Sequence, residues 1–279
     1  VHDERQCGLM LDSGSVSLAH SIVGPAGAPV VVFLHGFLGG KSDWAPTMDA
    51  LSSSYRCVSI DLPGHGESIG ESQACAMEYV ATALIELVDT FDAASFSMVG
   101  YSMGGRIALY VSSIYAMRVD ALVLESASPG LKTEAERAAR REQDERWAQI
   151  LENEGMVAFL DAWYEQPLFA SLASRPELIK RVKAKRSMNE PRALARALRG
   201  FSAGRQTPLW DEWKGNHIPA LVVAGELDAK YCAIAREMEQ ACSTCRAAII
   251  PCAGHNVHEE APNEYNSAIH TFLSETIKV

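Results

Sequence analysis

Uninterrupted apolar runs rich in β-branched residues recur along this chain of 279 residues, and turn-forming residues follow most of them. The run at residues 29–34 (PVVVFL) is typical of a strand that is buried on both faces of a parallel sheet. The other runs of this kind are residues 57–60, 96–99, 121–124, 220–223 and 247–250. Apolar stretches at residues 7–11 and 16–23 flank Asp12-Ser13-Gly14 and predict an opening hairpin.

Helical segments separate most of the predicted strands, and residues 262–277 carry apolar side chains at helical spacing. Strands that alternate with helices predict an α/β fold with a mostly parallel, doubly wound sheet. In such a sheet the functional site lies at the carboxyl ends of the strands. Residues that directly follow the strands are therefore the first candidates for chemistry.

The strand pattern stops between residues 129 and 213, where helix formers are interrupted by scattered glycines and prolines. We expect this segment to be a helical lid, inserted into a core of residues 1–128 and 214–279. The lid holds 15 Lys and Arg against 13 Asp and Glu, whereas the rest of the chain holds 10 against 22. Most of the lid cations are expected on solvated helix faces, with a few directed toward the site.

The overall composition, with 48% hydrophobic and 22% charged residues, is that of an ordinary globular protein. A formal charge of −10 argues against a nucleic-acid partner, because phosphate backbones bind basic surfaces. No apolar run is long enough to cross a bilayer, so we expect a soluble protein without a membrane partner. The chain begins with Val1 rather than Met, which suggests a processed form or a segment of a longer polypeptide.

The seven cysteines follow no regular spacing, which favours a reducing compartment. Cys242-Ser243-Thr244-Cys245 is an isolated C-x-x-C pattern, without a second pair or histidines at ligand spacing. We therefore expect ordinary thiols there and predict neither a metal nor a cofactor. Whether Cys242 and Cys245 pair is left open.

Gly100-Tyr101-Ser102-Met103-Gly104 lies between the apolar run at residues 96–99 and a helix-like segment at residues 106–116. This strand, turn and helix context is the one that the G-x-S-x-G nucleophile elbow requires. The glycines leave room for a turn tight enough to expose the serine hydroxyl. The pattern predicts an α/β-hydrolase fold, with Ser102 as the catalytic serine of a Ser-His-Asp triad.

The acid and the base of such a triad follow the serine in chain order, each at a strand end. Asp228 follows the run at residues 220–223, and His255 follows the run at residues 247–250. Glu226 is the rival acid and His258 the rival base. We prefer Asp228 because it lies beyond the strand end, and His255 because it follows a glycine in a loop.

Two backbone amides can form the oxyanion hole of this fold, one after the serine and one after an early strand. The sequence predicts those of Met103 and Phe37, the latter within His35-Gly36-Phe37-Leu38. His65, in Asp61-Leu62-Pro63-Gly64-His65, is interpreted as a structural or pocket-edge residue rather than a base.

Arg106 stands four residues after the serine, in the first turn of the predicted elbow helix. A cation there opposes the positive end of the helix dipole unless an anion binds nearby. One interpretation is a buried ion pair with a core carboxylate. The other is a clamp for a carboxylate of the substrate.

With these residues in place, the chain resembles the 2-succinyl-6-hydroxy-2,4-cyclohexadiene-1-carboxylate (SHCHC) synthases of menaquinone and phylloquinone biosynthesis. The resemblance covers nearly the whole length. It depends on the segments LHGFLGGKSDW, DLPGHGES, GYSMGGRIAL, SASPGL, ERAARREQDERW, WYEQPLFASL, FSAGRQTPLW, GELDAKY and AGHNVH. Arg106 and the lid segments point to this family, whereas the core motifs alone would fit many hydrolases.

The resemblance implies a lyase that eliminates pyruvate from a tricarboxylate, with Ser102, Asp228 and His255 as the proton-abstracting triad. The residues implied to bind substrate are Arg106, Arg140, Arg186, Trp163 and Tyr164. The register of the first lid arginine stays open, because Arg137 and Arg141 lie close by. The missing initiator methionine is similar to the plant arrangement, in which this domain is fused to other enzymes of the pathway in plastids. Outside plants, the cytoplasm is expected.

Two alternatives remain at this point. Ser102 could act as a true nucleophile in a carboxylesterase or carbon-carbon bond hydrolase. The chain could also be a ligand sensor that keeps the triad and signals through movement of its lid.

Overall fold

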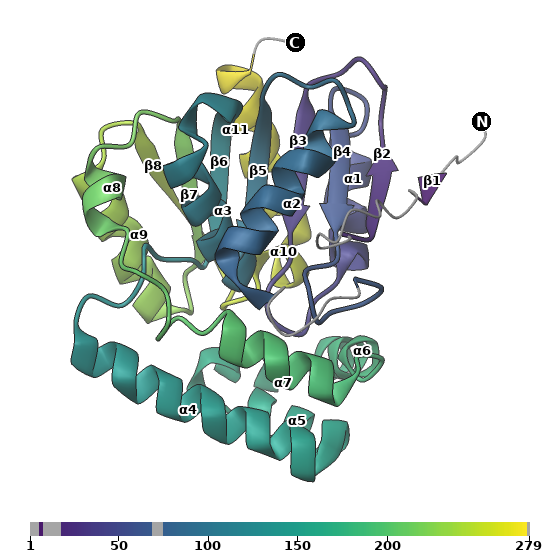
Figure 1. The fold of residues 1–279 in the computed structure, drawn as a ribbon, viewed down its shortest axis with the longest axis vertical. Coiled ribbons are helices and arrows are strands. Elements are labelled where there is room, and N and C mark those ends of the chain that lie inside the picture. The colour runs from purple at the N-terminus through teal and green to yellow at the C-terminus, as the bar shows by residue number, and fades with distance from the viewer. Residues whose placement is uncertain (1–5, 8–17, 69–74, 278–279) are drawn as a thin grey trace.

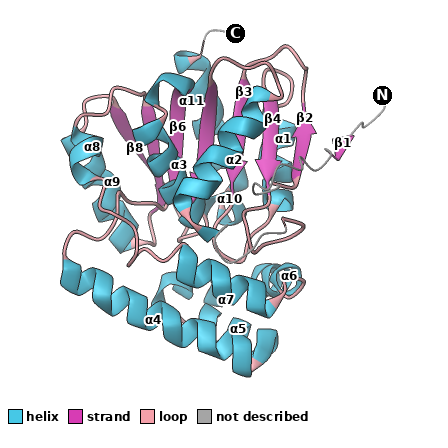
Figure 2. Ribbon diagram, in the orientation of Figure 1, coloured by secondary structure: helices cyan, strands magenta, loops and turns pink. Residues whose placement is uncertain are grey.

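The computed structural model describes residues 6–7, 18–68 and 75–277 (Figures 1 and 2). In these residues eight strands form one sheet, in the order β1-β2-β4-β3-β5-β6-β7-β8. The β1–β2 and β2–β4 pairs are antiparallel, and the other pairs are parallel. The strands are β1 (Gln6–Cys7), β2 (His20–Val23), β3 (Val30–Leu34), β4 (Arg56–Ile60), β5 (Phe96–Tyr101), β6 (Val119–Glu125), β7 (Ala220–Gly225) and β8 (Cys245–Ile250).

Each of the six predicted parallel strands is present, so the predicted α/β fold with a mostly parallel, doubly wound sheet is confirmed. Within the described residues, an antiparallel pair is present at this place, formed by β1 at Gln6–Cys7 and β2 at His20–Val23; most of the predicted first strand lies outside the described residues. The predicted turn at residues 12–14 lies outside the described residues.

Strand β3 illustrates why these runs form the centre of the sheet. Its five residues are all buried, and they alternate between two apolar clusters on opposite faces. Val30, Val32 and Leu34 pack into one cluster, whereas Val31 and Phe33 pack into the other. Since side chains alternate along a strand, an unbroken apolar run fits a sheet that is covered on both faces.

Helices cover both faces of the sheet. The first cluster packs one face of the sheet against α2 (Met77–Asp89), α3 (Met103–Ile114) and α9 (Ala229–Ala241). The second packs the other face of the sheet against α1 (Ala45–Leu51), α10 (Val257–Glu260) and α11 (Pro262–Thr276), the helix predicted at the chain end. Short 3₁₀ helices, η1 (Lys41–Trp44) and η3 (Ala116–Arg118), complete these connections.

Between β6 and β7 the chain is helical. The elements there are α4 (Glu134–Asn153), α5 (Gly155–Tyr164), the 3₁₀ helix η4 (Pro167–Ser174), α6 (Pro176–Arg186), α7 (Pro191–Gly200) and α8 (Trp210–Lys214). Helices α4 to α7 form a separate layer below the carboxyl ends of the parallel strands (Figure 1), here called the helical layer. It has its own apolar cluster, which includes Leu151, Phe159 and Leu194. The domain boundaries at residues 129 and 213 stay a prediction.

The strand order reverses at β3, because β4 lies on one side of it and β5 on the other. In open α/β sheets such a reversal leaves a crevice outside the carboxyl ends of the strands. The segments after β3 and β5, which carry Phe37 and Ser102, therefore lie at its edges. No helix among the described residues combines the length and the apolar character needed to cross a membrane.

Candidate active site

Ser102 lies at the turn between β5 and α3, with φ 49° and ψ −104°. Non-glycine residues rarely adopt positive φ, so the surrounding structure must hold this conformation. The Ser102 amide donates to the Glu125 carbonyl at 2.8 Å, which ties the turn to β6. A side chain at Gly104 would lie 2.2 Å from the Leu34 carbonyl oxygen, so only glycine lets α3 approach β3 this closely.

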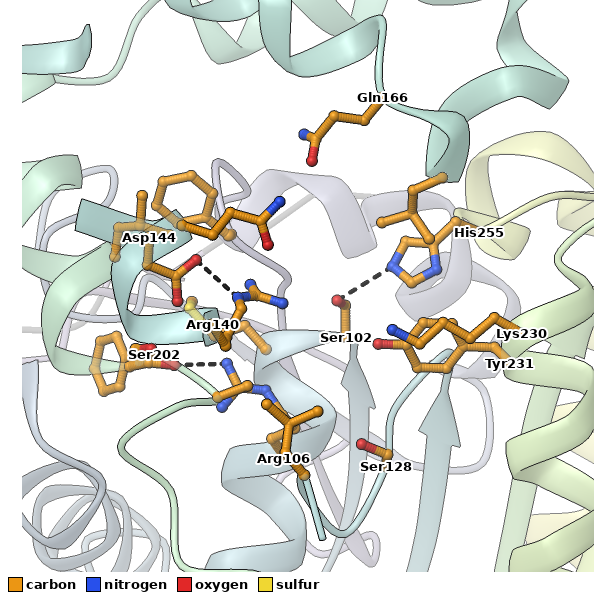
Figure 3. Close-up of a pocket in the computed structure, with 18 of the residues that line it drawn as sticks. Ser102, Arg106, Ser128, Arg140, Asp144, Gln166, Ser202, Lys230, Tyr231 and His255 are labelled. Atoms are coloured by element: carbon orange, nitrogen blue, oxygen red, sulfur yellow. Dashed lines mark hydrogen bonds and ion pairs between the residues drawn. The ribbon is translucent and has the colours of Figure 1, made fainter. Parts of the chain in front are cut away.

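The structure brings Ser102, His255 and Asp228 together at the ends of β5, β8 and β7. Figure 3 shows the ring of His255 directed toward Ser102. His255 Nε2 lies 3.2 Å from Ser102 Oγ, and His255 Nδ1 lies 2.7 Å from Asp228 Oδ2. His255 is 1% and Asp228 7% exposed. A buried carboxylate that orients a ring toward a hydroxyl is the arrangement that activates serine in triads.

Neither rival residue joins this chain of hydrogen bonds. Glu226 accepts a hydrogen bond from the backbone amide of Cys252. His258 is buried, and its Nδ1 lies 2.7 Å from a Glu125 side-chain oxygen. The two rivals thus support the loop and the helix start on either side of His255.

The predicted oxyanion residues Phe37 and Met103 both line the cavity that contains Ser102. Met103 begins α3, where a backbone amide has no earlier helical carbonyl to bind. The loop after β3 is braced by two buried histidines. His35 Nε2 accepts from the Leu62 amide, and His65 Nε2 accepts from the Leu38 amide. His65 therefore supports this loop. Among the described residues, its ring forms no hydrogen bond with Ser102.

A cavity of about 340 Å³ separates the triad from the helical layer. Its layer side is largely aromatic, and Trp163 and Tyr164, the two predicted lid residues, line it. The Trp163 ring lies 5.3 Å from Phe37 and 5.2 Å from Phe159 between ring centres. The cavity thus joins residues of both layers around one small-molecule space.

Arg106 lines the floor of the cavity beside Arg140 (Figure 3). Its two terminal nitrogens donate to the Gln206 side-chain oxygen at 3.0 Å and to the Phe201 carbonyl at 2.6 Å. In the described residues it forms no ion pair, so the interpretation as a buried ion pair with a core carboxylate is not supported. Burial, together with the nearby Arg140 guanidinium, lowers the pKa of Arg106 to about 10, which leaves it charged at neutral pH.

Arg140 and Arg186 also line the cavity, but each binds a buried aspartate. Arg140 Nε donates to Asp144 at 2.8 Å, and Arg186 Nη1 donates to Asp43 at 2.6 Å. Although burial disfavours its charge, Arg186 has a raised pKa because of the Asp43 carboxylate. Arg186 is only 4% exposed, so most of it faces protein rather than open space.

The register of the first lid arginine can be read from α4. Arg140 lines the cavity, whereas Arg137 and Arg141 bind Glu134 and nearby backbone carbonyls outside it. Of the three neighbouring arginines, Arg140 is therefore the one whose side chain can reach a ligand.

Several partners of the cavity arginines were not singled out from the sequence. Gln206 belongs to a segment that carries the resemblance, and nothing local to it indicates a contact with Arg106. The Arg140–Asp144 pair could have been found, because residues four apart share a helix face. Asp43 and Arg186 are 143 residues apart and offer no such signal.

The C-x-x-C cysteines are both free and buried, and burial raises the pKa of Cys245 to about 12. Within the described ranges, no group of three or more His, Cys, Asp or Glu side chains is placed to hold a metal ion.

Comparisons with known proteins agree with this geometry. Residues 29–262 match the family described as alpha/beta hydrolase fold. A solved structure of MenH from S. aureus superposes with a TM-score of 0.87 and 32% identity, over 92% of this chain and 98% of that one. The chain belongs to the α/β-hydrolase fold family.

Two relatives place the chain in a narrower family within this fold. The chain is 35% identical to the SHCHC synthase of Enterobacter sp. (strain 638), over 91% of this chain and 95% of that protein. It is also 35% identical to Protein PHYLLO, chloroplastic, of Arabidopsis thaliana, over 91% of this chain but only 16% of that protein. Within the α/β hydrolases, the chain belongs to the SHCHC synthase family. It spans a small part of the plant relative and nearly all of the bacterial one.

Proposed function

We propose that this protein is a carbon-oxygen lyase of menaquinone or phylloquinone biosynthesis. Its substrate would be 2-succinyl-5-enolpyruvyl-6-hydroxy-3-cyclohexene-1-carboxylate, and its products SHCHC and pyruvate. The observation that carries the proposal is the hydrogen-bonded chain of Asp228, His255 and Ser102, which opens onto a cavity that Arg106 and Arg140 also line. Family membership supports the same activity.

In this reaction Ser102 acts as a base. His255 takes the Ser102 proton, and Asp228 stabilises the imidazolium that forms. The serine oxygen removes the proton next to the succinyl ketone, and the electron pair moves onto the ketone oxygen. The amides of Phe37 and Met103 would hold this developing charge. Re-formation of the ketone shifts the ring double bond, completes the diene and expels the enolpyruvyl oxygen. The enolate of pyruvate takes up the proton that His255 holds and leaves as pyruvate, which returns the triad to its starting state.

The arginines would hold the three carboxylates of the substrate. Guanidinium groups suit this task because they bind carboxylates through paired, charge-assisted hydrogen bonds. Arg106, Arg140 and Arg186 are the candidates, and Trp163 and Tyr164 would pack on the ring from the layer side. No cofactor is needed for this elimination, because the base and the oxyanion hole supply the chemistry.

The plant relative is named as a chloroplast protein that is much longer than this chain. We therefore propose the plastid stroma, within a fused polypeptide of the same pathway, as the setting if the source is a plant. In a bacterial source the setting would be the cytoplasm.

A coupled assay of pyruvate release tests the function directly. With the purified diene precursor, the wild-type protein should release pyruvate over many turnovers, without any partner protein. Ser102→Ala should reduce the rate by at least ~10³-fold, as loss of a triad serine does in other enzymes. Hydrolysis of simple neutral esters, with no pyruvate from the tricarboxylate, would contradict the proposal.

A further inference from the structure

The three cavity arginines differ in the groups that hold them. Arg140 and Arg186 each bind the carboxylate of a buried aspartate, Asp144 and Asp43. Arg106 is held by two uncharged oxygens instead, one from Gln206 and one from the Phe201 backbone. Figure 3 shows Arg140 joined to Asp144, and Arg106 next to Ser202 on the segment after α7.

Gln206 is itself fixed in place. Its side chain is 5% exposed, and its amide nitrogen donates to the Pro129 carbonyl at 3.4 Å. This contact turns the amide so that its oxygen, rather than its nitrogen, faces the Arg106 guanidinium. A glutamate would have nearly the same shape, but its charge would form an ion pair with Arg106.

The difference between a neutral and a charged anchor changes the electrostatics of the cavity. An aspartate beside an arginine cancels most of its field, so the pair attracts an anion weakly. A neutral acceptor orients the guanidinium and leaves its positive charge uncancelled. Because Arg106 is partly buried, its charge is screened less than at a solvated surface, and an incoming carboxylate can compensate it.

We infer that Gln206 is a specificity-determining positioning residue that holds Arg106 without neutralising it, so that the cavity selects polycarboxylates. The inference deepens the proposed function, and only the identity of the natural substrate rests on that function. Gln206 acts through Arg106, because a neutral amide leaves the arginine available to a ligand carboxylate. Without this device, each cavity arginine would enter the site already paired with an acid.

Two substitutions separate charge from anchoring. Gln206→Glu adds a charge and keeps an oxygen for Arg106. Gln206→Met has a similar volume and removes that oxygen without adding charge. Both variants lose the amide donor to Pro129. They differ in the added charge and in the retained oxygen, and these two differences are expected to change citrate binding in opposite directions. Thermal melting of the full chain checks that each variant folds.

The probe is citrate, a simple tricarboxylate, and its dissociation constant is measured by calorimetry at low ionic strength. We expect Gln206→Glu to weaken citrate binding at least tenfold and Gln206→Met to weaken it less than threefold. If Gln206 were only a structural anchor, the order would reverse, because Met removes the hydrogen bond that Glu keeps. That reversal, equal losses, or no citrate binding by the wild-type protein would overturn the inference.

If Gln206→Glu does not fold, the test is a comparison of the citrate affinities of Gln206→Met and Arg106→Ala. The inference requires Gln206→Met to bind citrate much more tightly than Arg106→Ala, because its arginine keeps its charge. Equal affinities would overturn it.

Pyruvate release separates this inference from the proposed function. If the wild-type protein turns over the diene precursor, Gln206→Glu should raise KM more than it lowers kcat, as expected for a lost binding contact. If the wild-type protein releases no pyruvate but the citrate order holds, the proposed function fails and the inference stands. If it releases pyruvate and the citrate order reverses, the inference fails and the function stands.

Discussion

The sheet core and the helical layer hold their parts of the site in different ways. In the core, Ser102 sits in a strained turn, fixed by close backbone packing at Gly104 and by a hydrogen bond to β6. In the helical layer, Arg140 and Arg186 reach the cavity on long side chains that ion pairs orient. In the proposed reaction, the core holds the reacting atoms, and the layer supplies much of the recognition surface. Changes in the core should therefore affect the chemical step, and changes in the layer should affect binding.

The largest expected effect is on the core side, at Asp228, the proposed acid of the triad. Asp228→Asn should lower kcat for pyruvate release by about 10⁴-fold, because the amide cannot hold the histidine in the required tautomer. KM should change little, since Asp228 touches His255 rather than the cavity. Steady-state kinetics of pyruvate release would measure both constants.

Glu226→Gln is the matched control, because Glu226 is the other acid at the end of β7. Its side chain binds the Cys252 amide and not His255, so kcat should stay within about twofold of wild type. Equal losses in the two variants would remove the distinction between triad acid and loop support.

The second-largest effect is expected in the helical layer. Arg140→Gln should raise KM for the tricarboxylate by about 10- to 150-fold, the range expected for one hydrogen-bonded charge contact of 1.5–3 kcal/mol. The glutamine amide can still donate to Asp144, so the buried carboxylate keeps a partner. In the proposed reaction Arg140 binds substrate in the ground and transition states alike, so kcat should change much less than KM.

Arg141→Gln removes the adjacent arginine of α4 and is the control for charge loss alone. Arg141 binds Glu134 and the Gly204 carbonyl outside the cavity. The KM of Arg141→Gln for the tricarboxylate should stay within about threefold of the wild-type value. A rise in KM equal to that of Arg140→Gln would mean that the net charge of the layer, not one contact, controls binding.

The same division explains what the sequence could predict. The sheet was predictable because buried parallel strands require unbroken apolar runs, as in β3 and β7. Ser102, Asp228 and His255 could be placed next, since each follows such a run by a few residues. Buried strands are thus recognisable from the local sequence, and the residues at their ends can be located with them.

The side-chain contacts of the helical layer are harder to predict from the sequence. Helix spacing could have shown that Arg140 and Asp144 share a face, but not that this face meets the cavity. The Arg186–Asp43 pair joins residues 143 apart, and the Arg106–Gln206 pair joins residues 100 apart. Such partners depend on how the helical layer docks on the sheet, which no local pattern encodes. The resemblance named Arg186 as a substrate contact, whereas the structure adds that Asp43 already binds it.

The smallest expected effect concerns stability below neutral pH, and it arises in the core. Burial, together with the neighbouring His35 ring, holds the pKa of His65 well below its usual value, so the folded protein keeps this ring neutral. The unfolded chain takes up a proton there below about pH 6.5. The free energy of unfolding should therefore fall as the pH drops below about 6.5, until the folded ring also titrates. His258 acts in the opposite direction, because Glu125 raises its pKa despite burial and its stabilising contribution is lost as the pH rises.

Urea unfolding at pH 7.5 and pH 5.5 isolates the contribution of His65 when variants are compared. His65→Gln can still accept from the Leu38 amide but cannot titrate, so it should lose less free energy between the two pH values than the wild-type protein. His217→Gln, at an exposed histidine, should match the wild-type loss. If His65→Gln and the wild-type protein lose the same free energy, the buried histidines do not make the loop after β3 sensitive to acid. In that case the pH dependence of stability would have to come from carboxylates, including those that hold the arginines of the helical layer.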